Sequence, residues 1–200
     1  MPTIGITGGP ATGKSTLTAL LLERGAVGVS ADEIAREVLT PGTPAYRRVV
    51  ERFGEEVLRP DGTIDRSHLG RIVFSDERAR RDLEAITHPA ILDRLRARLA
   101  ELRERCGPDT PIVAEVPLLY EVGIESWFDR VVVVTAPEEL QVQRLQTRDH
   151  LSREEALARI RAQMPLSDKA DRADIVIVND GKEETLRLAA NLVFGDCDHA

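Results

Sequence analysis

The stretch GITGGPATGKSTLTALLL, Gly5–Leu22, places glycine-rich sequence between a β-branched run and a leucine-rich helical pattern. Gly8, Gly13, Lys14 and Ser15 match the phosphate-binding loop (P-loop) pattern G-x-x-x-x-G-K-[ST]. Glycine lets the backbone approach phosphate oxygens that a Cβ would hold away. The helix that follows adds unpaired N–H groups and the positive end of its dipole. The stretch therefore predicts a nucleotide-binding loop.

Two side chains of this loop carry the expected chemistry. Lys14 is expected to reach the β- and γ-phosphates, and the Ser15 hydroxyl is expected to bind Mg²⁺. An ordinary glycine-rich turn would not explain Lys14, because the only other lysines of the chain are Lys169 and Lys182. The loop residues expected to contact the bound nucleotide are Gly9, Ala11, Thr12, Gly13, Lys14, Ser15 and Thr16.

Short β-branched runs alternate with helical patterns along the chain. Two of these runs are almost entirely apolar, as expected for parallel strands that are buried on both faces. Strands that alternate with helices predict an α/β fold with a parallel sheet between helical layers. The expected strands are Thr3–Thr7, Val27–Ser30, Pro111–Val116, Arg130–Thr135 and Asp174–Val178.

Two long helical excursions interrupt this alternation. The first fills most of residues 31–110 and predicts an insertion of helices beside the sheet. The second, Glu138–Gln163, contains Ser152 and Glu155 at the spacing of a capping box. The helices expected in the first excursion are Asp32–Leu39, Ala45–Phe53, Ser67–Phe74, Asp76–Ile86 and Pro89–Arg105, the last ending at Gly107–Pro108.

Composition limits the possible partners and location. The net charge of −7 argues against a protein that coats nucleic acid, because such binding needs surplus Lys and Arg, but it allows small anionic ligands. No stretch reaches the roughly 18 apolar residues of a membrane span, and the N-terminus does not resemble a signal peptide. We therefore expect a soluble, cytoplasmic protein without a nucleic-acid or membrane partner.

Asp32 is the strongest candidate for a general base. It follows the second expected strand, and carboxyl ends of parallel strands share one edge of a sheet, where the γ-phosphate is expected. A carboxylate there could accept the proton of an attacking hydroxyl. The alternative is that Asp32 only caps the following helix. The chain has no N-K-x-D element typical of GTPases, and its third strand offers Glu115 instead of a strand-borne aspartate.

These residues belong to a larger set of segments that resembles the dephospho-CoA kinase family. The segments occur in the family's order from Thr3 to Gly181 and are together far more specific than the P-loop alone. They are GITGGPATGKST, SADEIAREVLTPGTPAY, FG at 53–54, DGTIDRSHLGRIVF, LEAITHP, VPLLYE, QVQRLQTRD and ADIVIVNDG.

The resemblance implies a transferase that uses ATP and Mg²⁺ to phosphorylate the ribose 3′-hydroxyl of dephospho-CoA, which gives coenzyme A and ADP. It also implies a P-loop kinase fold in three parts. These are a nucleotide-binding core of residues 1–31, 111–137 and 166–200, a helical substrate domain of residues 32–110, and a helical lid of residues 138–165.

The resemblance further implies roles for individual residues. Asp32 matches the catalytic base, and Arg144, with Arg148 beside it, matches the lid arginine that neutralises charge on the transferred phosphoryl group. Ser30 stands where the family commonly has the first aspartate of D-x-D, so the role of that carboxylate does not carry over. Asn179 and Gly181 match a loop near the adenine of ATP. The residues that match the acceptor site are Thr7, Asp32, His88, Pro89, Leu118, Leu119 and Tyr120, although His88 before a proline could simply mark a helix junction.

Two other functions remain open on the residues alone. A kinase of the same architecture could act on another nucleotide or nucleoside. A protein that binds ATP without turnover could act as a regulatory switch. Asp32 and the arginine-rich second excursion favour chemistry over a switch.

Overall fold

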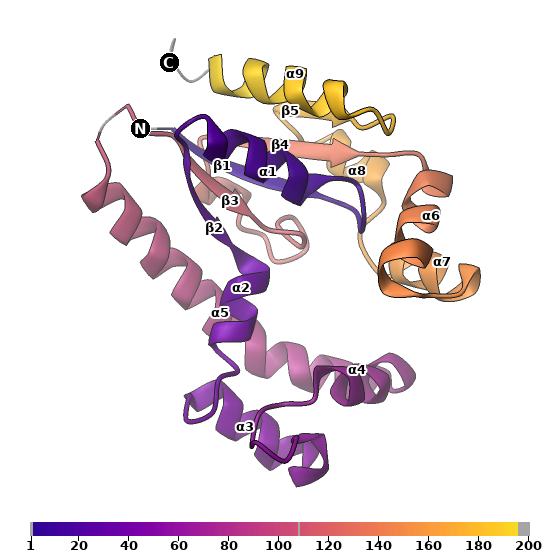
Figure 1. Cartoon of the computed structure of the whole chain (residues 1–200). Helices are drawn as coiled ribbons and strands as arrows, with labels where there is room; N and C mark the ends of the chain where they lie inside the picture. Colours follow the sequence, from indigo (N-terminus) through magenta and orange to yellow (C-terminus); the bar gives the residue numbers. More distant parts are fainter. Residues whose placement is uncertain (1, 108, 196–200) are drawn as a thin grey trace. The chain divides into compact units, whose positions relative to one another are not determined.

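The five strands of residues 1–30 and 102–200 form one parallel sheet (Figure 1). The computed structural model describes residues 2–107 and 109–195, with only the backbone at position 183. The strand order is β2-β3-β1-β4-β5, and every neighbouring pair is parallel. The α/β fold class and all five expected strands are confirmed. The strands are β1 (Thr3–Gly8), β2 (Val27–Ser30), β3 (Ile112–Glu115), β4 (Arg130–Thr135) and β5 (Ile175–Val178).

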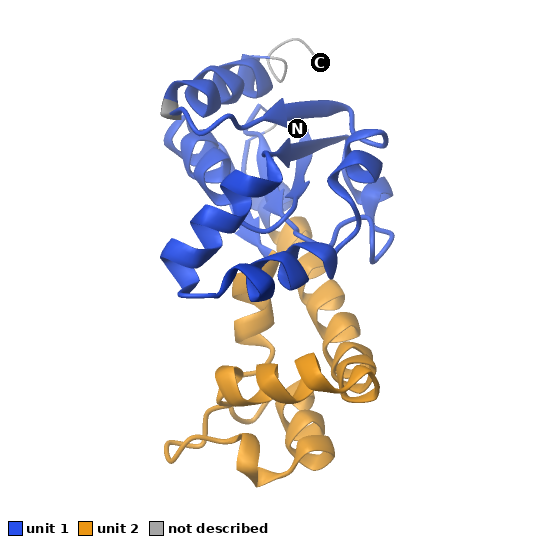
Figure 2. Cartoon of the chain, turned by 90° about the vertical axis from the view of Figure 1, so that its right-hand side faces the viewer, with its two compact units in different colours: residues 1–30, 102–200 blue, residues 31–101 orange. Residues whose placement is uncertain are grey.

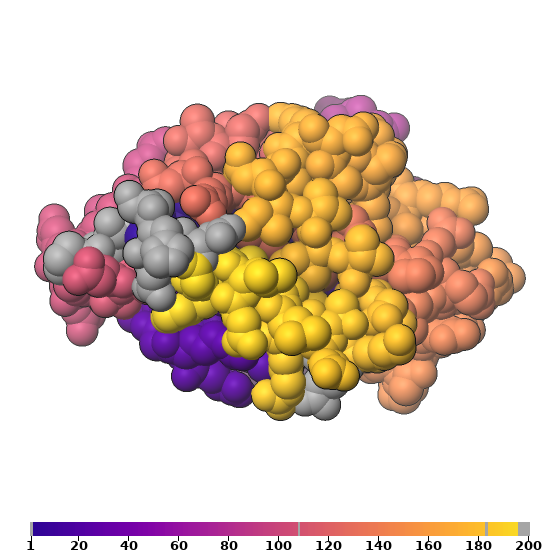
Figure 3. Space-filling model, turned by 90° about the horizontal axis from the view of Figure 1, so that it is seen from above, coloured from indigo at the N-terminus to yellow at the C-terminus, as the bar shows by residue number. Residues whose placement is uncertain are grey.

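Helices α1 (Lys14–Glu23) and α9 (Glu183–Gly195) lie side by side over one face of the sheet. Ile4 and Ile6 of β1 alternate along the strand and pack against Leu17 of α1 in a shared apolar cluster. The outer surface of α9 is visible in Figure 3, and its Leu188 and Leu192 side chains are exposed. This apolar layer holds the P-loop helix against the strand that precedes the loop.

The opposite face of β1 is packed by a different set of side chains. A Cβ on Gly5 would lie 2.7 Å from Leu119 Cδ1 and 2.9 Å from the Phe128 ring. The short helix α8 (Leu166–Ala170) contacts β4. Glycine at position 5 therefore leaves the space into which the segment after β3 packs.

The chain divides into two compact units, coloured separately in Figure 2. Unit 1 contains residues 1–30 and 102–200, and unit 2 contains residues 31–101. Unit 2 has its own apolar cluster, in which Val49, Phe53 and Leu69 are buried. Its elements are α2 (Ala31–Glu37), α3 (Pro44–Phe53), the 3₁₀ helix Glu55–Val57, α4 (Arg66–Ser75) and most of α5 (Glu77–Arg105).

Helix α5 corrects one expectation from the sequence. The two helices expected to meet near His88 are a single helix, with Pro89 inside it. Proline removes one backbone N–H bond, while the Thr87 hydroxyl donates to the Leu83 carbonyl at 2.8 Å in the turn before it. Apolar side chains are buried on both sides of the proline, so tertiary packing supports the helix through it. Its last residue is Arg105, and Pro108 of the expected stop signal lies outside the described residues.

The second excursion forms α6 (Glu138–Asp149) and α7 (Arg153–Arg161), which belong to unit 1. Val142, Leu145 and Ala156 form a small apolar cluster between these helices. The predicted capping box at the start of α7 is confirmed, since Ser152 and Glu155 bond reciprocally. A separate 3₁₀ turn, Glu125–Trp127, precedes β4.

Within residues 2–107 and 109–195, no helix is both long and apolar enough to cross a membrane.

The cluster beneath α1 leads to a stability prediction. Leu17→Ala removes a side chain that is 0% exposed, so the free energy of unfolding should fall by about 2–5 kcal/mol. Leu192→Ala, at a position that is 72% exposed, should change it by less than about 0.5 kcal/mol. Urea denaturation followed by circular dichroism measures both values. Similar losses in the two variants would contradict the packing described for α1.

Candidate active site

The P-loop connects β1 to α1, and two of its glycines are required by geometry. Gly8 has φ +145°, and a Cβ there would lie 2.2 Å from the Val134 carbonyl oxygen. Gly13 has φ +102°, and a Cβ there would lie 2.4 Å from Asn179 Nδ2. At both positions, any residue with a Cβ would have a strained backbone conformation, and its Cβ would clash with a neighbouring atom. Both glycines of the motif are therefore structural requirements of the loop.

The lysine of the motif folds against its own loop. Lys14 Nζ donates to the Gly9 carbonyl at 2.6 Å, and Thr12 Oγ1 donates to the same oxygen at 3.0 Å. Lys14 is buried, whereas Ser15 and Thr16, in the first turn of α1, are exposed. The ammonium group thus lies inside the loop, and the hydroxyl groups face a surface that a ligand can reach.

Two residues far along the chain meet this loop. Arg144 of α6 donates from Nη1 to the Ala11 carbonyl at 3.0 Å. Asn179, which follows β5 and is 2% exposed, donates from Nδ2 to the Thr12 carbonyl at 2.7 Å. The Asn179 Oδ1 atom accepts from the Gly181 N–H at 3.0 Å and from Arg144 Nη2 at 3.5 Å. The structure therefore brings the predicted lid arginine and the predicted adenine loop onto the P-loop backbone.

The neighbouring Arg148 lies in a different environment. Its guanidinium pairs with the Asp149 carboxylate at 2.7 Å, and this pair lowers the pKa of Asp149. Arg153 pairs with Glu139 in the same way. The first pair joins adjacent residues of α6, and the second joins the start of α7 to the start of α6.

A carboxylate that sequence reasoning did not assign to the site contacts the loop serine. Ser15 Oγ donates to Glu115 Oε1 at 2.7 Å, and Glu115 is only 8% exposed at the end of β3. Glu115 lies opposite Ser30 in the register of β3 with β2. The signal in the sequence was an acidic residue at the end of an apolar strand. Glu115 lies beside the P-loop because β3 pairs with β1. Ser15 and Glu115 together offer the hard oxygen donors that suit Mg²⁺.

The residues predicted for the acceptor in unit 1 are mostly packed. Leu119 is 0% exposed and Tyr120 is 5% exposed, and the Tyr120 hydroxyl donates to the Arg172 carbonyl at 2.9 Å. Burial raises the pKa of Tyr120 against the lowering effect of Arg172. Leu118 is half-buried and Thr7 Oγ1 donates to the Pro117 carbonyl at 3.1 Å. Leu118 is thus the most accessible of the three successive residues.

Asp32 lies in the first turn of α2, which begins at Ala31. It lies inside the helix and not at the cap position before Ala31, so the interpretation of Asp32 as the N-cap of this helix is wrong. Asp32 is exposed. His88 and Pro89 lie within α5, half-buried and exposed respectively, so His88 does not mark a helix junction.

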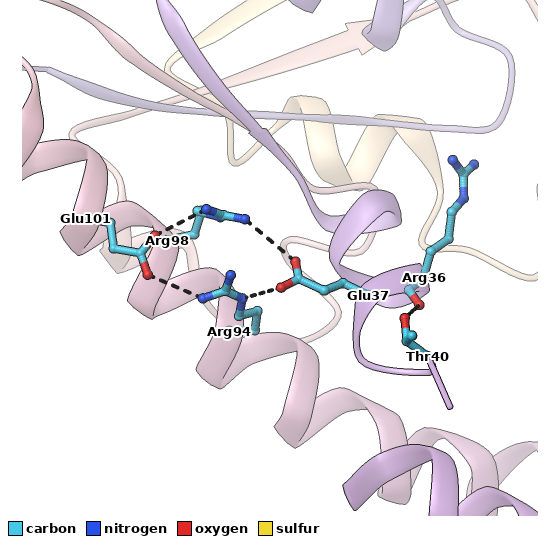
Figure 4. A network of polar contacts seen from close by, with 6 residues as sticks. All are labelled: Arg36, Glu37, Thr40, Arg94, Arg98 and Glu101. Atoms are coloured by element: carbon cyan, nitrogen blue, oxygen red, sulfur yellow. Dashed lines mark hydrogen bonds and ion pairs between the residues drawn. The ribbon is translucent and has the colours of Figure 1, made fainter. Parts of the chain in front are cut away.

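An ion-pair network within unit 2 holds α2 against α5 (Figure 4). Glu37 of α2 accepts from Arg94 Nε at 2.8 Å and lies 3.8 Å from Arg98 Nη2. Glu101 lies 3.3 Å from both arginines. The hydrogen bond to Glu37 raises the pKa of Arg94. The network fixes the helix that carries Asp32.

Sequence reasoning also missed two arginines near Asp32. The Arg36 side chain points away from the Glu37 carboxylate in Figure 4, and it lies one turn after Asp32 on α2. Arg66 Nη2 donates to the Ala35 carbonyl at 2.9 Å. Burial lowers the pKa of Arg66, and Arg36 lowers it further. The four-residue spacing of Asp32 and Arg36 was visible in the sequence, but the approach of Arg66 was not.

Comparison with known proteins gives one consistent family. The family model described as dephospho-CoA kinase matches residues 2–185. A dephospho-CoA kinase of Anaeromyxobacter dehalogenans is 50% identical over 196 residues, which cover 98% of this chain and 92% of that protein. A dephospho-CoA kinase of Geobacter sulfurreducens is 50% identical over 186 residues, which cover 93% of each chain.

Solved structures agree with the sequence relatives. A dephospho-CoA kinase from Campylobacter jejuni superimposes with a TM-score of 0.72 at 30% identity, covering 97% of this chain and 96% of that one. A protein from Thermus thermophilus superimposes with a TM-score of 0.79 at 37% identity, covering 98% of this chain and 97% of that one.

Two of the positive-φ glycines, Gly13 and Gly25, provide a matched test of the loop. Gly13→Ala should weaken ATP binding at least about tenfold, because the new Cβ would displace Asn179 and strain the loop. Gly25→Ala has a similar φ of +99° but nothing within 4 Å of the new Cβ, so it should leave ATP affinity unchanged. Titration calorimetry with ATP measures both. Equal affinities in the two variants would contradict the geometric requirement at Gly13.

Proposed function

Since the chain belongs to the dephospho-CoA kinase family, we propose that its P-loop, Arg144 and Asn179 form the ATP site of that kinase. The protein is an ATP-dependent kinase that phosphorylates dephospho-CoA in the last step of coenzyme A synthesis. The leading function from the sequence is thus confirmed over the two alternatives. The observation that carries the proposed ATP site is the convergence of Arg144 and Asn179 on adjacent loop carbonyls.

The loop residues act on the phosphates of ATP. The Lys14 ammonium would exchange its bond with the Gly9 carbonyl for bonds to the β- and γ-phosphates, and the N–H groups at the start of α1 would add further donors. During transfer, a bond forms between the acceptor oxygen and the γ-phosphorus, and the bond from this phosphorus to the bridging oxygen of ADP breaks. Arg144 would neutralise charge on the phosphoryl group as it passes between these oxygens.

Asp32 is proposed as the base that accepts the proton of the acceptor 3′-hydroxyl. Its carboxylate is exposed and follows the last residue of β2 by two positions. The network of Glu37 with Arg94 holds its helix. The acceptor would also contact His88, Pro89 and the half-buried Leu118 among the residues carried over from the family pattern.

The oxygen donors beside the P-loop fit Mg²⁺. In the described residues no group of three or more His, Cys, Asp or Glu side chains could hold a metal, and Mg²⁺ in kinases typically takes most of its ligands from phosphates and water. The Ser15 hydroxyl would be a ligand, and Glu115 would accept hydrogen bonds from this hydroxyl or from water bound nearby. When bound, Mg²⁺ neutralises charge on the phosphates.

We propose that separate parts of the chain bind the two substrates, as the family resemblance implies. Residues 32–110 would bind dephospho-CoA, and residues 138–165 would close over ATP. The bounds of compact unit 2, residues 31–101, are close to those of the proposed substrate domain, but unit 2 ends within α5. The cytoplasmic location and the absence of a nucleic-acid partner remain predictions.

The base is tested by Asp32→Asn, which keeps the shape of the side chain but removes its basicity. The kcat should fall by about 10²–10⁴ with little change in melting temperature. Asp93→Asn changes an exposed carboxylate of α5 in the same unit and should leave kcat unchanged. A coupled assay of ADP release, with and without dephospho-CoA, measures the rates. Wild-type kcat in the Asp32 variant would exclude the proposed base.

The lid is tested by Arg144→Ala. The kcat should fall much more than ATP affinity, because the guanidinium meets charge that develops during transfer. Arg144→Lys should recover only part of the loss, since an ammonium group cannot make the two-pronged contact.

Hydrogen exchange tests the motion independently. Amides of Glu138–Gln163 should become more protected when a non-hydrolysable ATP analogue and Mg²⁺ are added. Unchanged protection, together with an Arg144→Ala variant that is defective only in ATP affinity, would mean that this segment is a static wall.

A further inference from the structure

Lys169 of α8 is a buried cation that the proposed reaction does not use. Its side chain is 0% exposed. Burying an ammonium group is costly unless it is paired and hydrogen-bonded. Lys169 Nζ meets this requirement by donating to the Pro117 carbonyl at 2.8 Å and by pairing with Glu121 Oε1 at 2.8 Å. One buried ammonium group therefore holds both ends of the segment Pro117–Glu121.

The same two anchor points receive bonds from other parts of unit 1. The Pro117 carbonyl also accepts from Thr7 Oγ1, near the end of β1. Glu121 Oε1 also accepts from the Met164 N–H at 3.0 Å, in the segment that joins α7 to α8. Lys169 therefore shares its two acceptors with other elements. The Pro117 carbonyl is also bonded to β1, and Glu121 is also bonded to the segment after α7.

Helix α8 also reaches the P-loop. Leu166 Cδ2 lies 3.4 Å from the position that a Cβ on Gly9 would take. Gly9 carries the carbonyl that accepts from Lys14. One short helix thus places Leu166 close to Gly9 of the P-loop and bonds the Pro117–Glu121 segment through Lys169.

We propose that Lys169 is a positioning residue that sets the Pro117–Glu121 segment for binding dephospho-CoA. An apolar side chain would fill the same space at lower desolvation cost, but it could not make directional bonds to Pro117 and Glu121. Leu118 is half-buried between these two anchor points, so its placement depends on both. The inference rests on the proposed function of Leu118 in the acceptor site.

The test must separate positioning from stability. Lys169→Met alone leaves the Glu121 carboxylate without its cation, so the melting temperature should fall. The double variant Lys169→Met/Glu121→Leu removes both charges and should recover most of this loss, but the Pro117 carbonyl still lacks its ammonium donor. In the double variant, the KM for dephospho-CoA should rise about tenfold, and the KM for ATP should stay within about twofold of wild type. Lys169→Arg, which keeps the charge and donors, should recover part of the KM.

Arg24→Met is the matched control. It removes a cation that bonds Asn191 between α1 and α9 in the same unit, away from the site, and should leave both KM values unchanged. Steady-state kinetics with each substrate varied, together with thermal melts, measures all variants. Equal rises of the two KM values, or a melting-temperature loss with unchanged KM values, would overturn the positioning role.

Leu118→Ala separates failure of this inference from failure of the proposed acceptor site. A raised KM for dephospho-CoA in Leu118→Ala, with a wild-type KM in the double variant, would overturn the inference about Lys169 and leave the acceptor site standing. An unchanged KM in Leu118→Ala would overturn the acceptor role of the segment, and with it the inference.

Discussion

The pairing of β1 with β3 and β4 is the constraint on which the site in unit 1 depends. Because all three strands are parallel, their carboxyl ends lie at one edge of the sheet. The P-loop leaves β1 at this edge, Glu115 ends β3 there, and β4 leads to the helix that carries Arg144. A shift in this register would separate Ser15 from Glu115, which are 100 positions apart in the chain.

The P-loop is held from outside as well as by its own glycines. Three loop carbonyls, those of Gly9, Ala11 and Thr12, accept from Lys14, Arg144 and Asn179 respectively. A loop whose carbonyls are engaged in this way presents its N–H groups to an anion. The same contacts tie the loop to α6 and to the segment after β5, which are distant from it in the sequence.

In unit 2, the Asp32 carboxylate lies on a short helix, α2. Helix α2 has seven residues, too few for a stable isolated helix. Its Ile34 is buried, and Glu37 is fixed by two arginines of the much longer α5. Exposed ion pairs are individually weak, but a network of four charges also fixes the orientation of the helices that carry them.

The P-loop, the five strands and the family could be predicted from the sequence, because each depends on residues that are close together or on a pattern repeated along the chain. The glycine spacing around Lys14 encodes a local backbone shape, and β-branched runs encode buried strands. The continuous helix through Pro89 could not be predicted, since local propensity favoured a break and packing of distant apolar residues overrode it. The partnership of Ser15 with Glu115, the contact of Arg144 with Ala11 and the burial of Lys169 were decided only by the tertiary structure. These contacts join residues separated by long stretches of chain, and only the strand order and helix packing bring their atoms within hydrogen-bond distance.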